Sequence, residues 1–128
     1  MAETWIFTQT LRIGNNSYAT AVTKTSDGAY TYDSAVAANQ TDKLVACNID
    51  VSQVVGIYIS SDQDCTIETN SNNASGGQTI NIDADNPYVW VKDSGITNPL
   101  TTDITALYIT NTTAITRLQI RILVDLTV

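Results

Sequence analysis

Two pairs of closely spaced carboxylates are the residues of this chain best placed to do chemistry: Asp62 with Asp64, and Asp83 with Asp85. Two carboxylates set across a cleft, one of them with a raised pKa, can hydrolyse glycosidic bonds, and carboxylates grouped with loop carbonyls can bind Ca²⁺. Asp is also a common turn residue, and both pairs lie in turn-like sequence. The segment 83–86 (DADN) lacks the glycine and terminal glutamate of an EF-hand loop. We therefore predict structural turns at both pairs, with no metal.

Histidine is absent from the chain, and its absence removes several reaction classes. Ser-His-Asp and Cys-His nucleophiles need the imidazole, and so do the common zinc and iron ligand sets. The segment 75–77 (SGG) is not followed by the lysine and helix of a phosphate-binding loop. The sequence predicts no catalytic residue and no cofactor, so we expect a protein that is not an enzyme.

The two cysteines, Cys47 and Cys65, each lie within an apolar strand pattern. A disulfide between them would close a loop of about 19 residues and add about 3 kcal/mol of stability in the chain-entropy model. Synthesis in a reducing cytoplasm favours free thiols, and the chain offers no histidine to activate either one. We predict two free, buried thiols.

Several aromatic side chains are candidates for an interaction surface. Four of them alternate with aliphatic residues along their strands, so we expect them to stand opposite the aliphatic faces. Such a row can stack against sugar rings, fill a subunit interface, or pack beneath a loop as part of the core, and the last two alternatives have equal weight. Aromatic enrichment at interface hot spots favours an interface over a sugar site. The candidate interface residues are Tyr58, Tyr88, Trp90 and Tyr108, together with Trp5 and Phe7 of the N-terminal strand.

The composition indicates an all-β protein. The chain has twenty threonines, whose branched side chains suit strands, and eleven asparagines, which suit turns. Its acidic residues are eleven Asp against two Glu, again favouring turns over helices. A length of 128 residues fits one domain spanning residues 1–128.

One sequence pattern, called the repeated phrase below, occurs twice: DVSQVVGIYISSD beginning at Asp50, and DITALYITN beginning at Asp103. Each contains an aliphatic–Tyr–aliphatic core, which predicts an amphipathic strand, and each is followed by a turn and a second run of strand residues. The pair predicts either a duplication that places two equivalent strands on opposite sheets, or two strands that merely share a composition.

Alternating apolar residues and turn signals predict eight to ten strands in an antiparallel β-sandwich, jelly-roll or Greek-key-like. The Ala-rich segment 34–39 is the only stretch that suggests a helical turn, and the polar segment 70–77 reads as a hairpin loop. The expected strands are 5–13, 18–25, 30–32, 44–51, 55–59, 65–70, 79–83, 88–92, 104–111 and 117–126.

Two of these strands have an especially clear inward face. In the N-terminal strand the half-buried face is expected to carry Trp5, Phe7, Leu11 and Ile13. The residues of the last strand that we expect to face inward are Leu118, Ile120, Ile122, Val124 and Leu126.

The charge of the chain argues against two classes of partner. The net charge is −7, and the six basic residues are scattered. Nucleic-acid binding depends on clustered cations, and anionic membranes repel an acidic surface, so we expect neither partner. No run of apolar residues reaches the 18 of a membrane span, and the start of the chain reads as a strand and not as a secretion signal.

Three segments carry a resemblance to a known group of proteins: Ile57–Asp64 (IYISSDQD) with its continuation Thr66–Asn70 (TIETN), Pro87–Trp90 (PYVW) and Asp103–Asn111. In these segments the chain resembles small β-sandwich virion proteins of tailed bacteriophages, a group that includes capsid decoration (cement) proteins. The resemblance implies an all-β oligomer, with a trimer favoured, bound to the capsid exterior at local symmetry axes and without enzyme activity. It implies no role for the two cysteines.

These observations lead to one expected function and one alternative. We expect a non-enzymatic capsid decoration protein that binds the major capsid protein lattice and its own copies. Its location would be the virion exterior, and the host cytoplasm during assembly. The alternative is a carbohydrate-binding β-sandwich, associated with a phage tail or particle, that grips host glycans.

Overall fold

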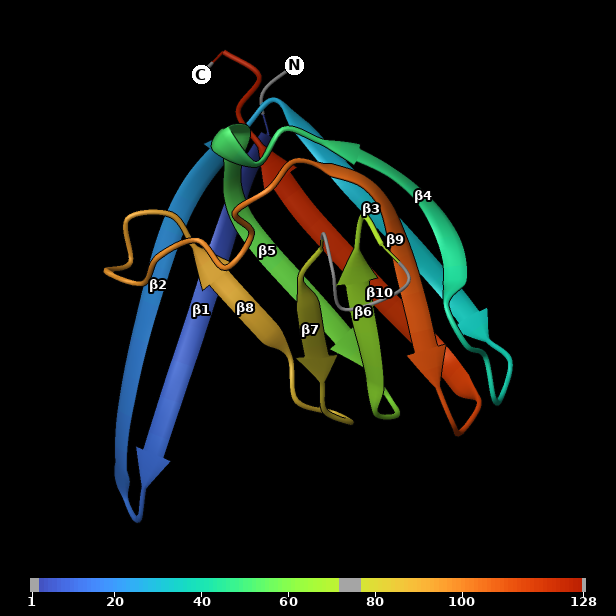
Figure 1. The fold of residues 1–128 in the computed structure, drawn as a ribbon. Helices are drawn as coiled ribbons and strands as arrows, with labels where there is room; N and C mark the ends of the chain where they lie inside the picture. The colour runs from blue at the N-terminus through green and yellow to red at the C-terminus, as the bar shows by residue number, and fades with distance from the viewer. Residues whose placement is uncertain (1–2, 72–76, 128) are drawn as a thin grey trace.

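The protein folds into ten β-strands and a single 3-10 turn, in a computed structural model that describes residues 3–71 and 77–127 (Figure 1). The all-β prediction is therefore confirmed, and the strand count lies within the expected range. The strands are β1 (Glu3–Ile13), β2 (Asn16–Ser26), β3 (Gly28–Val36), β4 (Lys43–Ile49), β5 (Val54–Ser61), β6 (Cys65–Thr69), β7 (Thr79–Ile82), β8 (Tyr88–Val91), β9 (Ile104–Asn111) and β10 (Ile115–Val124), with the 3-10 turn η1 at Val51–Gln53.

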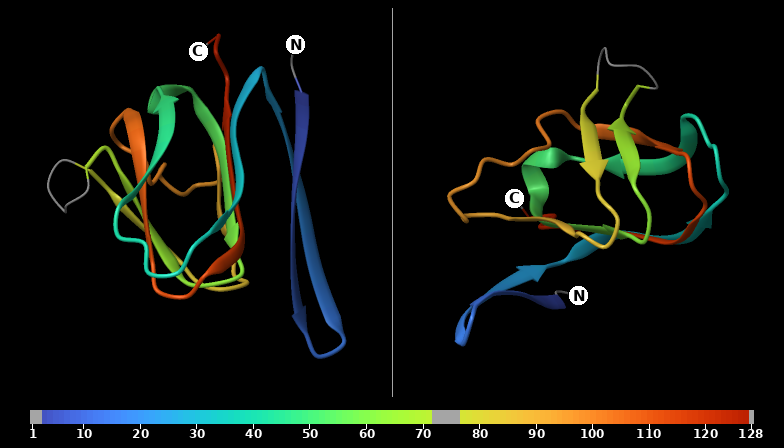
Figure 2. Two further views of the ribbon diagram at one scale, coloured as in Figure 1. Left: turned by 90° about the vertical axis from the view of Figure 1, so that its right-hand side faces the viewer. Right: turned by 90° about the horizontal axis from the view of Figure 1, so that it is seen from below.

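Eight of the strands form two antiparallel sheets that pack face to face as a sandwich (Figure 2). The first sheet has the order β3-β10-β5-β8, and the second sheet has the order β4-β9-β6-β7. These orders are compatible with an eight-stranded jelly roll, in which two Greek keys interlock. The remaining strands, β1 and β2, form a separate hairpin.

The strand order contains an internal two-fold relation. Exchanging β3 with β7, β4 with β8, β5 with β9 and β6 with β10 converts the strand order of the first sheet into that of the second sheet, read in reverse. The two repeated phrases form β5 and β9, which lie in opposite sheets, as the duplication hypothesis predicted. The strand after each phrase crosses to the other sheet, where β10 pairs with β5 and β6 pairs with β9.

The core lies between the two sheets and is built mainly of isoleucine, leucine and valine. The aliphatic residues of both repeated phrases are buried there, as are the inward residues of β10 as far as Ile122. The residues with essentially no exposed surface include Ile57, Ile59, Leu107, Ile109, Leu118 and Ile120. Each sheet therefore presents one apolar face to its partner, as the alternating pattern requires.

Three local predictions are wrong. The segment 34–39 is not helical: its first half continues β3, where Val36 is buried and pairs with Ile115 of β10. The strand predicted at 44–51 ends at Ile49, because the Asp50 side chain caps the 3-10 turn that follows it. Leu126 lies beyond the end of β10 and is exposed instead of facing inward. The predicted loop at 70–77 falls largely on residues 72–76, outside the described part of the chain.

Both cysteine thiols are free and buried, as predicted. Burial raises the pKa of Cys47 to about 12 and that of Cys65 to about 11. Burial also raises the pKa of Tyr30 to about 12, and the hydroxyl of Tyr30 donates a hydrogen bond to the Ala46 carbonyl at 2.9 Å. All three groups are therefore neutral in the folded protein at physiological pH.

These shifts predict a loss of stability at alkaline pH. Each folded-state pKa lies above the ordinary value of 9.0 for a thiol or 10.0 for a tyrosine, so the unfolded chain loses these protons first. The stabilising contribution is complete below the unfolded pKa and is lost as the pH rises through the folded pKa. Urea unfolding from neutral pH to about pH 11 should show this decline, and the variant Cys47→Ala should show a shallower one. An identical slope in the variant would contradict the assignment.

Candidate interaction surface

The hairpin of β1 and β2, called the arm below (Glu3–Ser26), is the most distinctive surface feature of the molecule. Its strands pair along eleven residues each and are joined by a two-residue turn at Gly14-Asn15. Gly14 has a φ of 57° and occupies the first central position, where a type II′ hairpin turn requires glycine. The arm runs along the outer side of the first sheet and extends past the end of the sandwich (Figures 1 and 2).

The root of the arm (Glu3–Phe7 with Val22–Ser26) is anchored on the first sheet. The ring of Phe7 reaches so close to Gly56 that a Cβ atom built there would lie 2.7 Å from Phe7 Cζ. The Nζ atom of Lys24 lies 3.5 Å from Oδ2 of Asp93, which follows β8. Trp5 is half-buried and lines a cavity with residues of β3. Trp5 and Phe7 are both predicted interface residues, but much of their side-chain surface contacts other parts of the same chain.

The tip of the arm (Thr8–Ala21) has apolar side chains that remain exposed. Leu11 pairs with Tyr18, so the two side chains share a face with Ile13. Their exposed fractions are 59% for Leu11, 58% for Tyr18 and 60% for Ile13. The predicted half-buried face is therefore half-buried at the root only. Period-2 alternation identifies an apolar face, but it does not say whether anything covers that face.

The arm packs on the body less completely than the two sheets pack on each other. A hollow of about 150 Å³ lies between the arm and β8. Near the root, Trp5 Nε1 and Ser26 Oγ are buried without a hydrogen-bond partner among the described residues. Both residues line a second cavity of about 290 Å³. Buried polar atoms without partners reduce stability, so the contact between arm and body is a weak one.

Filling the space at Gly56 should loosen the arm. In Gly56→Ala the new methyl group would displace the Phe7 ring and press on Leu123, at a cost of about 1 kcal/mol. Amide hydrogen exchange should then accelerate in β1 and β2 while β5 and β10 stay protected. Adding Phe7→Leu to this variant should relieve the clash. Unchanged exchange in the arm would contradict the anchoring role of Phe7.

Two of the predicted interface aromatics face the core. Trp90 pairs with Ile57 and Tyr88 pairs with Ile59, which places both aromatic rings on the inner face of the first sheet. Trp90 is 7% exposed, and its Nε1 donates a hydrogen bond to the Ile96 carbonyl at 2.8 Å. The two rings do stand opposite the aliphatic residues of their strand, Val89 and Val91, but the aromatic face is the one that meets the core, which was one of the alternatives left open by the sequence.

The other two tyrosines face outward, but on opposite sides of the sandwich. Tyr58 lies on the outer face of the first sheet, between Arg121 and Val89. Tyr108 lies on the outer face of the second sheet, where its cross-strand neighbours are Leu44 and Glu68. The six predicted residues thus form no single surface, and the continuous aromatic row that a sugar platform would use is not present in the described residues.

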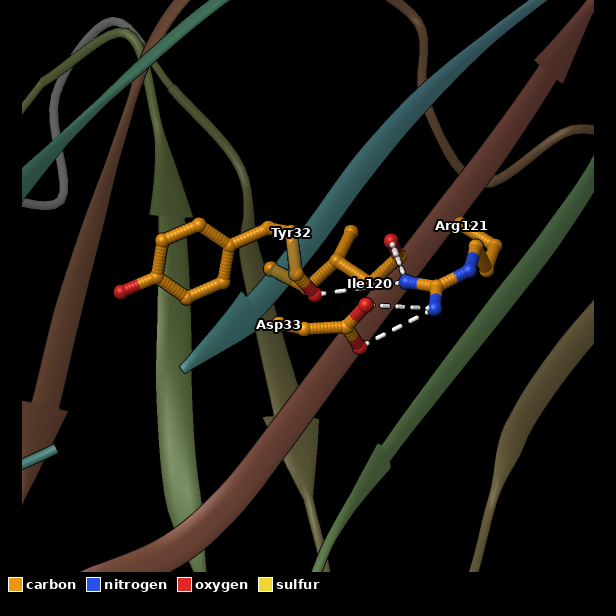
Figure 3. Close-up of polar contacts among 4 residues, drawn as sticks. All are labelled: Tyr32, Asp33, Ile120 and Arg121. Atoms are coloured by element: carbon orange, nitrogen blue, oxygen red, sulfur yellow. Dashed lines mark hydrogen bonds and ion pairs between the residues drawn. The ribbon is translucent and has the colours of Figure 1, made fainter. Parts of the chain in front are cut away.

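One pair of opposite charges on the outer face of the first sheet is joined within the chain. Figure 3 shows Arg121 directed toward Asp33, with its Nη2 atom 3.0 and 2.7 Å from the two carboxylate oxygens. Nη1 of Arg121 donates to the carbonyls of Ile120 and Tyr32, two residues paired across β10 and β3. The hydrogen bond from Arg121 lowers the pKa of Asp33. The guanidinium group of Arg121 is therefore already bound by groups of the same chain.

The first carboxylate pair holds the turns in place. Asp62 accepts hydrogen bonds from the backbone N–H groups of Thr116 and Arg117, and these bonds lower its pKa. Asp64 accepts one from the N–H of Ala84 at 2.7 Å. A general acid would need a raised pKa, which the Asp62 site does not provide.

The second pair lies in a tight turn. The N–H of Asn86 donates to the Asp83 carbonyl, and Asp85 adopts a φ of 57°. Across residues 3–71 and 77–127, no three Asp, Glu or Cys side chains converge as metal ligands would. The structure thus places this pair in a turn, as the sequence predicted.

A hollow of about 590 Å³ lies at one end of the second sheet and is lined mainly by polar residues. Several of its lining groups are already bonded within the chain. Asn111 accepts from the Gln40 N–H and donates to the carbonyls of Ala37 and Thr113, each at 3.0 Å. These hydrogen bonds join separate segments at this end of the sandwich, so the polar groups around the hollow have a structural role.

No protein-family model, curated protein or solved structure matches this chain. The part of the chain that the structure describes contains no helix with the length and apolar character needed to cross a membrane.

The exposed arm tip is the feature that the sequence analysis did not predict. The signal that could have revealed it is the position of Leu11, Ile13 and Tyr18 beside a two-residue turn, as far along the hairpin as possible from the rest of the chain.

Proposed function

We propose that this chain is a non-enzymatic structural protein that assembles by protein–protein contact through its arm. The single observation that carries the proposal is the exposure of Leu11, Ile13 and Tyr18 on one face of the arm tip. A two-stranded hairpin is only marginally stable by itself in water, and grouped apolar side chains that remain exposed mark interaction sites. Tyrosine is also enriched at interface hot spots.

The particle that we propose for this assembly is the capsid of a tailed bacteriophage. The segments that resemble virion decoration proteins form β5, β6, β8 and β9, so they belong to the body of the sandwich. Viral capsid domains are among the known uses of jelly rolls, and lectin domains are another, so this support is analogy only. The partners would be the major capsid protein lattice and other copies of this chain, on the capsid exterior.

A rebinding experiment tests this proposal. Purified protein should bind capsids that lack it and raise the temperature at which they release their genome. Capsids saturated with the protein beforehand provide the control, because they should take up no more. Failure to bind any protein-deficient capsid from the phage that encodes the chain would remove the proposed location.

A further inference from the structure

We infer that the arm tip of one copy binds the outer face of the second sheet, β4-β9-β6-β7, of another copy of this chain. The inference rests on the proposed assembly through the arm, but it does not depend on which particle the protein decorates. Four properties of the described residues support it: an uncovered face, apolar complementarity, charge and length.

The second sheet has an outer face that no other strand among the described residues covers. The sandwich has two outer faces, and the arm lies along that of the first sheet (Figure 2). On the opposite side, the views show no strand over β4, β9, β6 and β7. A monomer can thus cover part of one outer face with its own arm and has no second arm for the other.

The uncovered face and the arm tip carry matching apolar side chains. Leu44 is 63% exposed and pairs with the half-buried Tyr108, so the two stand side by side on this face. The pair Ala46 and Ala106 lies next to them along β4 and β9. The small alanines leave room for a large partner side chain beside Leu44 and Tyr108. The exposed side chains of Leu11 and Tyr18 have the size and apolar character to occupy it.

Charge favours contact between an arm and a body. The arm has two cations, Arg12 and Lys24, against one carboxylate, Glu3, whereas residues 27–128 have four cations against twelve carboxylates. Glu68 lies beside Tyr108, and its Oε2 atom is buried without a donor among the described residues. The arm therefore has a net positive charge and the rest of the chain a net negative one, so contact between an arm and a body is favoured, while two arms or two bodies would repel each other.

The dimensions of the two surfaces agree. The arm tip has six residue pairs, from Thr8 and Ala21 to Ile13 and Asn16. At about 3.4 Å per residue the tip is about 20 Å long, and four strands about 4.8 Å apart make a sheet about 15–20 Å wide. The free half of the arm is thus long enough to cross the second sheet of a neighbour.

The contact joins two different surfaces, and this fixes the kind of assembly. Such a heterologous interface closes into a ring when the rotation between copies permits, whereas a two-fold dimer needs the same surface from both copies. Each copy in a ring donates one arm tip and accepts another. A closed ring agrees with the trimer that the resemblance to virion decoration proteins implies.

Cysteine cross-linking between two distinguishable copies tests the inference. One copy carries Leu11→Cys and an affinity tag, and the other carries Leu44→Cys without a tag. The native thiols are buried, so the unmodified chain serves as the background control. Mild oxidation of the mixture should give a disulfide between tagged and untagged chains. Pairing Ile6→Cys, on the opposite face of the arm, with Leu44→Cys should give at least about tenfold less product, because a disulfide needs Cα atoms within about 7 Å.

The alternative outcomes are distinct. A disulfide between two Leu11→Cys copies would show arm-to-arm contact and overturn the inference, as would the absence of any product above the background. Cross-linking of Leu11→Cys to the capsid protein on rebound particles would overturn it while supporting the proposed function. A product between tagged and untagged chains, from a protein that binds no capsid, would support the inference and remove the proposed location.

Discussion

Replacing Trp90 with alanine is expected to lower the free energy of unfolding by about 3–5 kcal/mol. The indole is 7% exposed and belongs to the cluster of buried residues between the sheets. Its removal leaves a cavity beside Ile57, and it leaves the Ile96 carbonyl without the donor that now lies 2.8 Å away. An aromatic residue that served only as an exposed binding anchor would cost far less stability.

Two matched variants separate the causes of this loss. Trp90→Phe keeps an aromatic ring but loses the Nε1–H donor and some volume, so a loss of about 1–2 kcal/mol is expected. Tyr58→Ala removes an outward-facing aromatic from the neighbouring strand and should cost less than Trp90→Ala. Urea unfolding monitored by circular dichroism measures all three. Near-native stability of Trp90→Ala would show that this ring does not belong to the core.

Trp90 also shows where strand patterns stop being informative. Both faces of β8 are apolar, with Tyr88 and Trp90 on one side and Val89 and Val91 on the other. One face meets the core, while the arm covers part of the other. Alternation predicted the strand and its two faces correctly, but two apolar faces gave no basis for choosing the inner one.

The arm shows the same limit of strand patterns in the opposite case, in which a regular apolar face is exposed. Leu11 and Ile13 alternate with polar residues as regularly as Ile120 and Ile122 do, yet the first pair is exposed and the second is buried. The alternation depends on local sequence, whereas burial depends on which strands meet across the whole chain. The duplication hypothesis fared better, because its prediction concerned the relation between two strands, and β5 and β9 do lie in opposite sheets.

Local propensity failed where distant pairing decides the structure. The segment 34–39 is rich in alanine, which favours helix in isolation. Its first residues instead pair with β10, about eighty positions later in the chain, where Ser34 lies opposite Leu118. Tertiary pairing of this kind overrides helix preferences that are worth only tenths of a kcal/mol per residue.

Changing Leu11, Ile13 and Tyr18 together to serine is expected to convert the assembled protein to a monomer. Each side chain is more than half exposed in a single copy, so the folded monomer loses little when they change. Interface anchors typically contribute about 1–2 kcal/mol each, so three of them predict an association roughly a hundredfold to ten-thousandfold weaker. Sedimentation equilibrium over a range of protein concentrations measures this change.

The control for this variant is Ile6→Ser, because Ile6 is equally exposed but lies on the other face of the arm. It should leave the association unchanged. The thermal unfolding of the triple variant, measured at concentrations where the native protein is also monomeric, should match that of the native chain. If the triple variant stays assembled, the arm tip is not the contact. If it unfolds at a clearly lower temperature, the tip stabilises its own chain, and the exposed side chains cannot be explained by a partner.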